Sequence, residues 1–336
     1  MTLSERRPPV PVPKDQKASD KEVVDKKKDG NKKKKKEPSR RLLDLKFALH
    51  LMTRNPLVLA GTVMSAAIIL IAVFSGFIVN PDLANKVSYA TQLCWGNHFV
   101  NWGPGSSYCS SNQFYWLGTD YFGRGILSMI ILALPLDLEI AFAVVAGSVA
   151  IGMILGGIAA YGGSAADEFI LRVTDIFFGF PTLLFALVVA AVVGPSIFTL
   201  TMAVLLVWWP VYVRLVRGQI LAEKEKNYVE ALRSVGAGNF RILFRHIMPN
   251  AIYPVMVQAT LDLGGVILIF SSLMFLGFSP KQNLPELGNL ISQGIQNVFT
   301  APWLIIFPGV AILLATFSFN LVGDGLRDVF DPRLRR

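Results

Sequence analysis

The sequence has little of several residue types on which catalysis and metal binding depend. Its 336 residues include two cysteines, Cys94 and Cys109, and three histidines, His50, His98 and His246, in three separate segments. A zinc site or a histidine-based triad needs side chains brought together in defined sets. The dipeptide Gly-Lys never occurs, so the Gly-x-x-x-x-Gly-Lys-[Ser/Thr] loop that holds ATP phosphates is missing. We therefore expect no catalytic residue, no metal site and no cofactor bound by this chain.

Charged residues are also scarce. They make up 16% of the chain, whereas 53% of residues are hydrophobic, which is too apolar for an ordinary soluble domain. A membrane-spanning helix needs about 20 mostly apolar residues, because the hydrocarbon layer is ~30 Å thick. Segments of about this length are 57–79, 138–160, 177–194, 197–215, 253–275 and 303–323. These segments predict an all-α, polytopic membrane protein with six transmembrane helices, residues 57–336 forming one transmembrane domain.

Positive charge is concentrated near the N-terminus. Residues 1–46 contain 16 Lys/Arg and 8 Asp/Glu, a net charge of +8, and the other 290 residues contain 16 and 15, a net charge of +1. Residues 1–41 have almost no apolar side chains to bury, so they predict a disordered basic cytoplasmic tail near anionic lipid. Nucleic acid is not an expected partner, because no aromatic residue interleaves these charges. Residues 42–56 predict an amphipathic cytoplasmic lead-in helix.

The remaining basic residues predict how the chain is oriented. Of these 16, 13 fall in loops on one side of a six-span arrangement, and only Lys86, Arg124 and Lys281 fall on the other. The positive-inside rule then places both termini in the cytoplasm, with an external loop at 80–125. That loop contains Cys94 and Cys109, and an external compartment can be oxidising. We expect a disulfide between them, the alternative being two unpaired small residues.

The segment 217–252 is polar and basic although it lies between two apolar spans. Helix-forming residues predict a helix over Leu221 to Val235, and glycines at 236 and 238 then end it. A second short helix is predicted from Phe240 to Met248, stopped by Pro249. Gly236 permits a positive φ, and an exposed Glu230 offers strong acceptors to a partner. The segment is therefore predicted to be a cytoplasmic docking surface, the alternative being a solvated hairpin without a partner.

One ionisable side chain, Asp262, lies near the middle of a predicted span. A lone carboxylate there costs about 2.5–3.5 kcal/mol on insertion scales, so it needs a partner or a watery path. Two interpretations stay open: Asp262 contacts substrate or a partner helix along a pore, or it forms a hydrogen bond within the bundle, for example to Gln258. Asp137 and Glu139 stand at the outer end of the second span. They are expected to line the external mouth or to be hydrated.

Several motifs together resemble the oligopeptide/dipeptide branch of binding-protein-dependent ABC importer permeases. The resemblance covers about residues 42–336 and is to the C-type half of the channel. It includes Leu-Gly-Thr-Asp at 117–120, Gly-Arg at 123–124, Ala-Tyr-Gly-Gly at 160–163 and Asn-Leu-Val-Gly-Asp-Gly at 320–325. In the family's ATPase-coupling loop, matched by 217–252 here, the corresponding residues are Tyr228, Glu230, Ala231, Gly236, Arg245, His246 and Pro249.

The resemblance implies a type I ABC importer permease fold in the cell membrane. It implies half of a translocation path for oligopeptides or dipeptides, paired with a homologous permease. An external solute-binding protein would supply the peptide, and two ATPase subunits that use ATP and Mg would drive transport. Phe270 stands where the family commonly has Glu, so Phe270 and Asp262 are candidate residues of the translocation path. Oligosaccharides or metal chelates are alternative substrates. An ATP-independent secondary transporter, with Asp262 relaying protons, is a rival.

Overall fold

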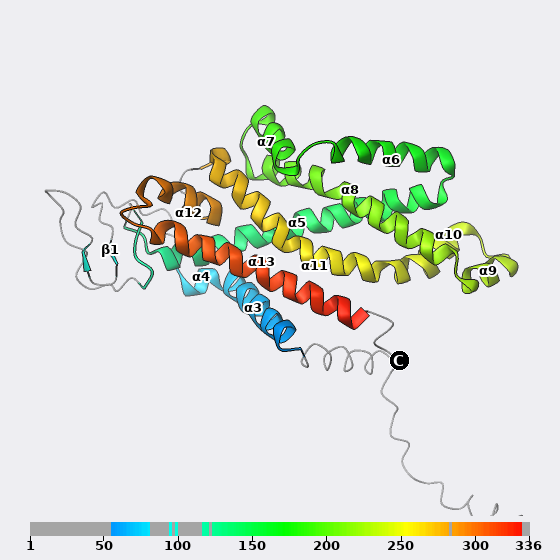
Figure 1. The fold of residues 1–336 in the computed structure, drawn as a ribbon, viewed down its shortest axis with the longest axis horizontal. Helices are drawn as coiled ribbons and strands as arrows, with labels where there is room; N and C mark the ends of the chain where they lie inside the picture. Colours follow the sequence, from blue (N-terminus) through cyan, green and yellow to red (C-terminus); the bar gives the residue numbers. More distant parts are fainter. Residues whose placement is uncertain are drawn as a thin grey trace, which may run out of the picture. The chain divides into compact units, whose positions relative to one another are not determined.

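Long helices make up nearly all of the chain that the structure describes (Figure 1). The computed structural model describes residues 55–80, 94–95, 98–99, 116–120, 123–281 and 284–330. All of them belong to one compact unit, Leu49–Arg336. The predicted tail at 1–41 and residues 42–54 of the predicted lead-in lie outside the described residues, as does Cys109.

Five helical segments within the described residues are long and apolar enough to cross a membrane. They are α3 (Pro56–Val73), α5 (Ile126–Tyr161), α8 (Ile197–Lys224), the continuous segment Asn239–Phe278 and α13 (Trp303–Phe330). The continuous segment consists of α10 (Asn239–Ile242), the π-helix η2 (Leu243–Ile247), α11 (Met248–Leu273) and the π-helix η3 (Met274–Phe278). An all-α chain with several membrane-spanning helices is therefore confirmed.

The second and third predicted spans need correction. The helix predicted at 138–160 begins at Ile126, because Ile126, Met129 and Ala133 are buried in the core and α5 continues through Pro135. The span predicted at 177–194 is not one helix. It falls on the end of α6 (Ser164–Phe178) and on α7 (Thr182–Val193), which are bent by 85° to each other. Pro181 ends the first helix, since it lacks an N–H and restricts the residue before it. Counted as one span, this bent pair brings the number to six.

Glycines on the spans allow helix backbones to approach closely. A Cβ at Gly152 of α5 would lie 2.4 Å from Cβ of Tyr212 in α8. A Cβ at Gly61 of α3 would lie 2.3 Å from Cβ of Leu321 in α13. A Cβ at Gly325 of α13 would lie 2.2 Å from Cγ1 of Val58 in α3. Because residues near the start of α3 contact residues near the end of α13, these two helices run antiparallel (Figure 1).

Two short helical segments lie at opposite ends of the bundle (Figure 1). α9 (Asn227–Ser234) follows α8 and precedes α10. α12 (Leu287–Gly294) and the 3-10 helix η4 (Ile295–Asn297) lie between η3 and α13, and α12 packs against both. α4 (Ser75–Ile78) extends α3, and β1 (Cys94–Trp95) pairs antiparallel with β2 (His98–Phe99). The main apolar core connects α5, α8, α11, α12 and α13.

Candidate functional site

The predicted docking segment is built around the short amphipathic helix α9. Its inward side chain, Val229, is fully buried in an apolar cluster with Ile220 of α8 and Ile242 of α10. On the other face, Glu230 and Ala231 are exposed. One buried side chain thus fixes the helix to the bundle, while two of the residues that the sequence selected for docking, Glu230 and Ala231, are exposed.

The turn after α9 has the backbone conformation predicted for it. Gly236 has φ +81°, a value that L-residues rarely adopt, and its N–H donates to the carbonyl oxygen of Arg233 at 2.9 Å. No atom lies within 4 Å of the position that a Cβ would occupy. Gly238, two residues on, has φ −68° and ψ 151°, which any residue accepts. Conformation rather than space therefore restricts the residue at position 236.

The predicted helix from Leu221 to Val235 is in fact two helices. α8 ends at Lys224 and α9 begins at Asn227. The break is held by Glu223, which forms an ion pair with Lys226 and accepts a hydrogen bond from the Tyr228 hydroxyl at 2.8 Å. Tyr228 therefore acts within the chain, as a contact that joins α9 to α8, and is half-buried rather than fully presented.

The predicted stop at Pro249 is also wrong. α10, η2 and α11 continue through it as one helical segment, with Pro249 in the first turn of α11. The π-helical turn η2 ends at Ile247, two residues before the proline, so the hydrogen-bond register departs from that of an α-helix close to it. Arg245 and Pro249 are exposed and His246 is half-buried.

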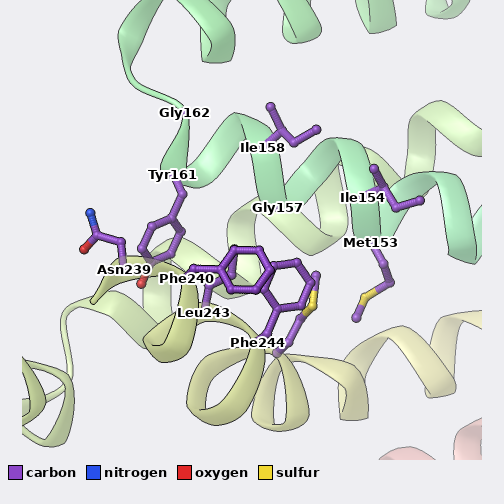
Figure 2. A pocket seen from close by; sticks show the side chains of 11 residues that line it. Met153, Ile154, Gly157, Ile158, Tyr161, Gly162, Asn239, Phe240, Leu243 and Phe244 are labelled. Atoms are coloured by element: carbon purple, nitrogen blue, oxygen red, sulfur yellow. The ribbon is translucent and has the colours of Figure 1, made fainter. Parts of the chain in front are cut away.

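An apolar cavity lies beside this segment, between the end of α5 and α10–η2 (Figure 2). Its volume is about 550 Å³. Its lining includes Ile154 and Ile158 of α5 and Phe240, Leu243 and Phe244 of α10 and η2. The rings of Phe240 and Phe244 lie 4.4 Å apart between centroids, and Phe240 is 75% exposed. An exposed carboxylate, Glu230, and exposed aromatic side chains are therefore both found in the segment from α9 to η2.

Ion pairs join α6 to α8 near the same end. Arg217 donates to Asp167 through Nη2 at 2.6 Å and through Nε, and Arg214 pairs with Asp175. Arg172, by contrast, makes only a 3.5 Å contact with Glu168 on its own helix, and both side chains are exposed. Arg214 and Arg217 therefore connect α8 to α6, whereas the side chain of Arg172 is exposed.

Asp262 accepts hydrogen bonds from other side chains of this chain, among them Tyr212 and Gln258. The Tyr212 hydroxyl donates to its Oδ2 at 2.7 Å, and Gln258 Nε2 donates to its Oδ1 at 2.9 Å. The predicted bond to Gln258 is confirmed. Tyr212 was not predicted, because it lies 50 residues away in sequence and no local pattern connects the two. Asp262 is half-buried in this chain. Its place on a translocation path stays a prediction.

The other candidate residues are more deeply placed or lie outside the described part. Phe270 is fully buried in the main apolar core of this chain. Its role in translocation stays a prediction. Cys94 lies in β1, but Cys109 is not among the described residues, so the predicted disulfide stays a prediction. Among the described residues, no group of three or more His, Cys, Asp and Glu side chains could hold a metal ion.

Polar residues at the α12 end are buried, which sequence analysis did not anticipate. Asp120 and Arg124 form an ion pair at 2.6 Å with both side chains buried, and Arg124 also donates to Gln293 at 3.4 Å. Trp303 Nε1 donates to the carbonyl oxygen of Thr119 at 3.2 Å. The motif at 117–124 therefore holds the start of α5 against α12 and α13.

The expectation for Asp137 was wrong. Asp137 is 2% exposed and faces the N-terminus of α12 instead of water, because α12 folds back over this part of α5. Glu139, two residues further along, is exposed as expected. Glu286, which was not selected from the sequence, is 0% exposed and caps α12 by accepting the N–H of Asn289 at 2.7 Å. No strong local signal existed, since the preferred N-cap residues are Ser, Thr, Asp, Asn and Gly rather than Glu.

Comparison with known proteins identifies the class of this chain. Residues 148–336 match the family described as binding-protein-dependent transport system inner membrane component. The dipeptide transport system permease protein DppC of Alkalihalophilus pseudofirmus is 35% identical over 86% of this chain and 90% of the relative. DppC of Escherichia coli (strain K12) is 39% identical over 85% of this chain and 92% of the relative. The glutathione transport system permease protein GsiD of Pectobacterium atrosepticum is 34% identical over 84% of this chain and 89% of the relative.

The chain belongs to this family of inner membrane components. It is the permease of an ABC import system, not its ATPase, and it is a multi-pass membrane protein. A binding-protein-dependent system also includes a solute-binding protein and an ATPase. The resemblance found in the sequence motifs is thereby confirmed.

Proposed function

We propose that this chain forms half of a channel that imports dipeptides or oligopeptides. The substrate class rests on relatives that are named for dipeptide and glutathione transport and that cover most of this chain. The other half is a homologous permease, and an external solute-binding protein delivers the peptide. Two ATPase subunits use ATP and Mg to drive transport, whereas this chain holds no cofactor.

In this proposal the α9 end of the bundle faces the cytoplasm and the α12 end faces outward. The distribution of basic residues supports this orientation, because Arg233, Arg241 and Arg245 all lie near α9. The start of α3 and the end of α13 lie near each other, so both termini of the chain would be cytoplasmic. The protein would then be a plasma-membrane permease of the type I ABC importer kind.

The surface around α9 is proposed as the contact with the ATPase. The observation that carries this assignment is the exposed Glu230 on a helix held by buried Val229, followed by a turn at φ +81°. The exposed rings of Phe240 and Phe244, in the helical segment that follows α9, supply apolar surface in the same part of the chain. A carboxylate can pair with a basic group of an ATPase subunit while apolar surface excludes water. Movement of the ATPases would then be transmitted through α8 and α11.

Substitution of the two loop glycines tests this assignment. Gly236→Val places a β-branched residue at a positive φ, which distorts the turn without a clash inside the bundle. Gly238→Val is the matched control, because the same side chain enters the same loop at φ −68° with open space around it. We expect normal membrane insertion and permease pairing for both variants. In proteoliposomes, Gly236→Val should lose ATP-dependent peptide uptake and the ATPase stimulation caused by binding protein.

The outcome is informative in each direction. Normal uptake by Gly236→Val would contradict the coupling assignment. Loss of uptake in both variants, with stimulation of ATPase activity intact, would place the defect outside the coupling step. Glu230→Ala should weaken coupling more mildly, since it removes one charge-assisted contact of about 1.5–3 kcal/mol.

A further inference from the structure

Two buried carboxyl groups meet at the N-terminus of α12. Glu286 begins this helix and Asp137 reaches it from α5, and their side chains lie within hydrogen-bonding reach of each other. Both residues are buried, at 0% and 2% exposed. The proposed transport function uses neither of them.

The oxygen atoms of this pair can be accounted for one by one. Glu286 Oε1 accepts from the Ser271 hydroxyl at 2.8 Å and Oε2 accepts from the N–H of Asn289 at 2.7 Å. Asp137 Oδ2 accepts from the N–H of Leu287 at 3.4 Å. Asp137 Oδ1 is buried and has no hydrogen-bond partner. A buried carboxylate oxygen left without a donor is costly, and such atoms are rare in folded proteins.

A proton removes this deficiency. A protonated carboxyl group has an O–H donor, whereas an ionised one can only accept. If Asp137 holds the proton, it can donate to the Glu286 carboxylate, and the repulsion between two adjacent negative charges disappears. The Glu286 charge that remains lies at the positive end of the α12 dipole and keeps its bonds to Ser271 and Asn289.

The surroundings of the pair offer hydrogen-bond donors to Glu286. From α12 come backbone N–H groups of Gly288 and Asn289, from α11 the Ser271 hydroxyl, and from α5 only Asp137 itself, since Glu139 is exposed. In the segment before α5, Asp120 and Arg124 are paired with each other. Burial raises the pKa of Glu286, although these hydrogen bonds act in the opposite direction.

We propose that Asp137 and Glu286 together bind one proton, and that this shared proton holds the N-terminus of α12 against α5 and α11. The ligand is the proton itself, taken up from water on the side of the membrane that α12 faces. Loss of the proton leaves two adjacent negative charges in an apolar site and loosens α12.

The direction in which stability changes with pH follows from the raised pKa of Glu286. A carboxyl group whose pKa is higher in the folded protein than in the unfolded chain binds more protons when folded. Its contribution to stability is fully present below the ordinary pKa of a glutamate. That contribution is lost as the pH rises through the raised value. The folded transporter should therefore lose thermal stability between mildly acidic and alkaline pH.

Infrared spectroscopy and melting curves of the purified, complete transporter test this proposal. The wild type should show the carbonyl stretch of a protonated carboxyl group at neutral pH, and both Asp137→Asn and Glu286→Gln should lose it. An asparagine at 137 has a permanent N–H donor, so Asp137→Asn should keep the melting temperature of the wild type at acidic pH and lose its decline at alkaline pH. Glu139→Gln, on the same helix, is the control and should change neither property.

Three results would overturn the proposal. They are a carboxyl band that persists in Asp137→Asn, a pH profile of melting that is unchanged in Asp137→Asn, and a wild-type melting temperature that does not fall as the pH rises. The last measurement needs no variant, so it holds even where a substitution prevents folding. None of these readouts depends on substrate uptake, so failure of the proton site is distinct from failure of the proposed transport function.

Discussion

Polar side chains at the α12 end of the bundle are buried and bonded to one another, whereas those at the α9 end are largely exposed. At the α12 end, Arg124 is paired with Asp120 and Glu286 caps the helix, both inside the protein. At the α9 end, Glu230 is exposed and two apolar side chains, Val235 and Phe240, are 80% and 75% exposed.

This difference concerns how each end of the bundle compensates its charged side chains. Burying a charged group is favourable only when hydrogen bonds or an opposite charge compensate the loss of water. At the α12 end, Asp120 and Arg124 meet that condition with each other. The α9 end leaves aromatic surface and a carboxylate uncovered, which is consistent with a surface that another subunit covers in the proposed complex.

The largest expected effect comes from a glycine at the α12 end. A Cβ at Gly288 would lie 1.9 Å from the carbonyl oxygen of Ser271 and 2.7 Å from its Cα, so α12 could not keep its place on α11. Overpacking of this kind costs about 1–3 kcal/mol and sometimes more. Gly288→Ala should therefore lower the melting temperature of the purified transporter strongly or reduce the yield of folded protein.

Gly218→Ala provides the comparison at the other end. Gly218 lies in α8, and no atom is within 4 Å of the position of a Cβ. Alanine in a helix interior is more favourable than glycine by roughly 0.5–1 kcal/mol, so this variant should be as stable as the wild type or slightly more so. Equal melting temperatures for the Gly288→Ala and wild-type proteins would refute the close packing of α12.

An intermediate effect is expected between the two ends, at Asp262. Tyr212→Phe removes the hydroxyl that donates to this carboxylate, a hydrogen bond to a charged group worth about 1.5–3 kcal/mol. A double-mutant cycle with Asp262→Asn should give a coupling energy of about 0.5–3 kcal/mol in thermal or chemical unfolding. Tyr253→Phe, at a 47% exposed position of α11, is the control and should have little effect.

The same variants separate the two interpretations of Asp262. Where its role is structural, uptake in proteoliposomes should fall only as far as stability does. A larger loss of uptake in Asp262→Asn than in Tyr212→Phe, at similar stability, would instead support a place on the translocation path. A coupling energy near zero would contradict the hydrogen bond itself.

The smallest effects are expected from the ion pairs near α9. Arg217→Ala removes a two-pronged contact with Asp167 in which both side chains are 26% exposed, and should cost about 1 kcal/mol. Arg172→Ala removes a 3.5 Å contact between side chains 74% and 69% exposed, and should cost less than ~0.5 kcal/mol. Unfolding curves at low and high salt measure both. An equal cost for the two would show that the link between α6 and α8 adds no stability.

Hydrophobic length and local turn chemistry could be predicted from the sequence. Apolar segments located most of the spans, because a helix must be long and apolar to cross a membrane whatever it packs against. The positive φ of Gly236 was predictable for a similar reason, since the backbone restriction is local. The motifs taken together, at 117–124, 160–163, 217–252 and 320–325, were enough to place the chain in its family.

The partners of the polar residues were decided only by the tertiary structure. Asp262 bonds to Tyr212 across 50 positions, and Asp137 meets α12 because that helix folds back over α5. The continuation of the helix through Pro249, close to a π-turn, is likewise something that no short-range rule predicts. By itself, the sequence determined which segments are apolar, where the backbone must turn and to which family the chain belongs, because these properties depend on neighbouring residues. Which carboxyl groups are buried, and what compensates them, depends on helices that are distant in the chain and adjacent in space.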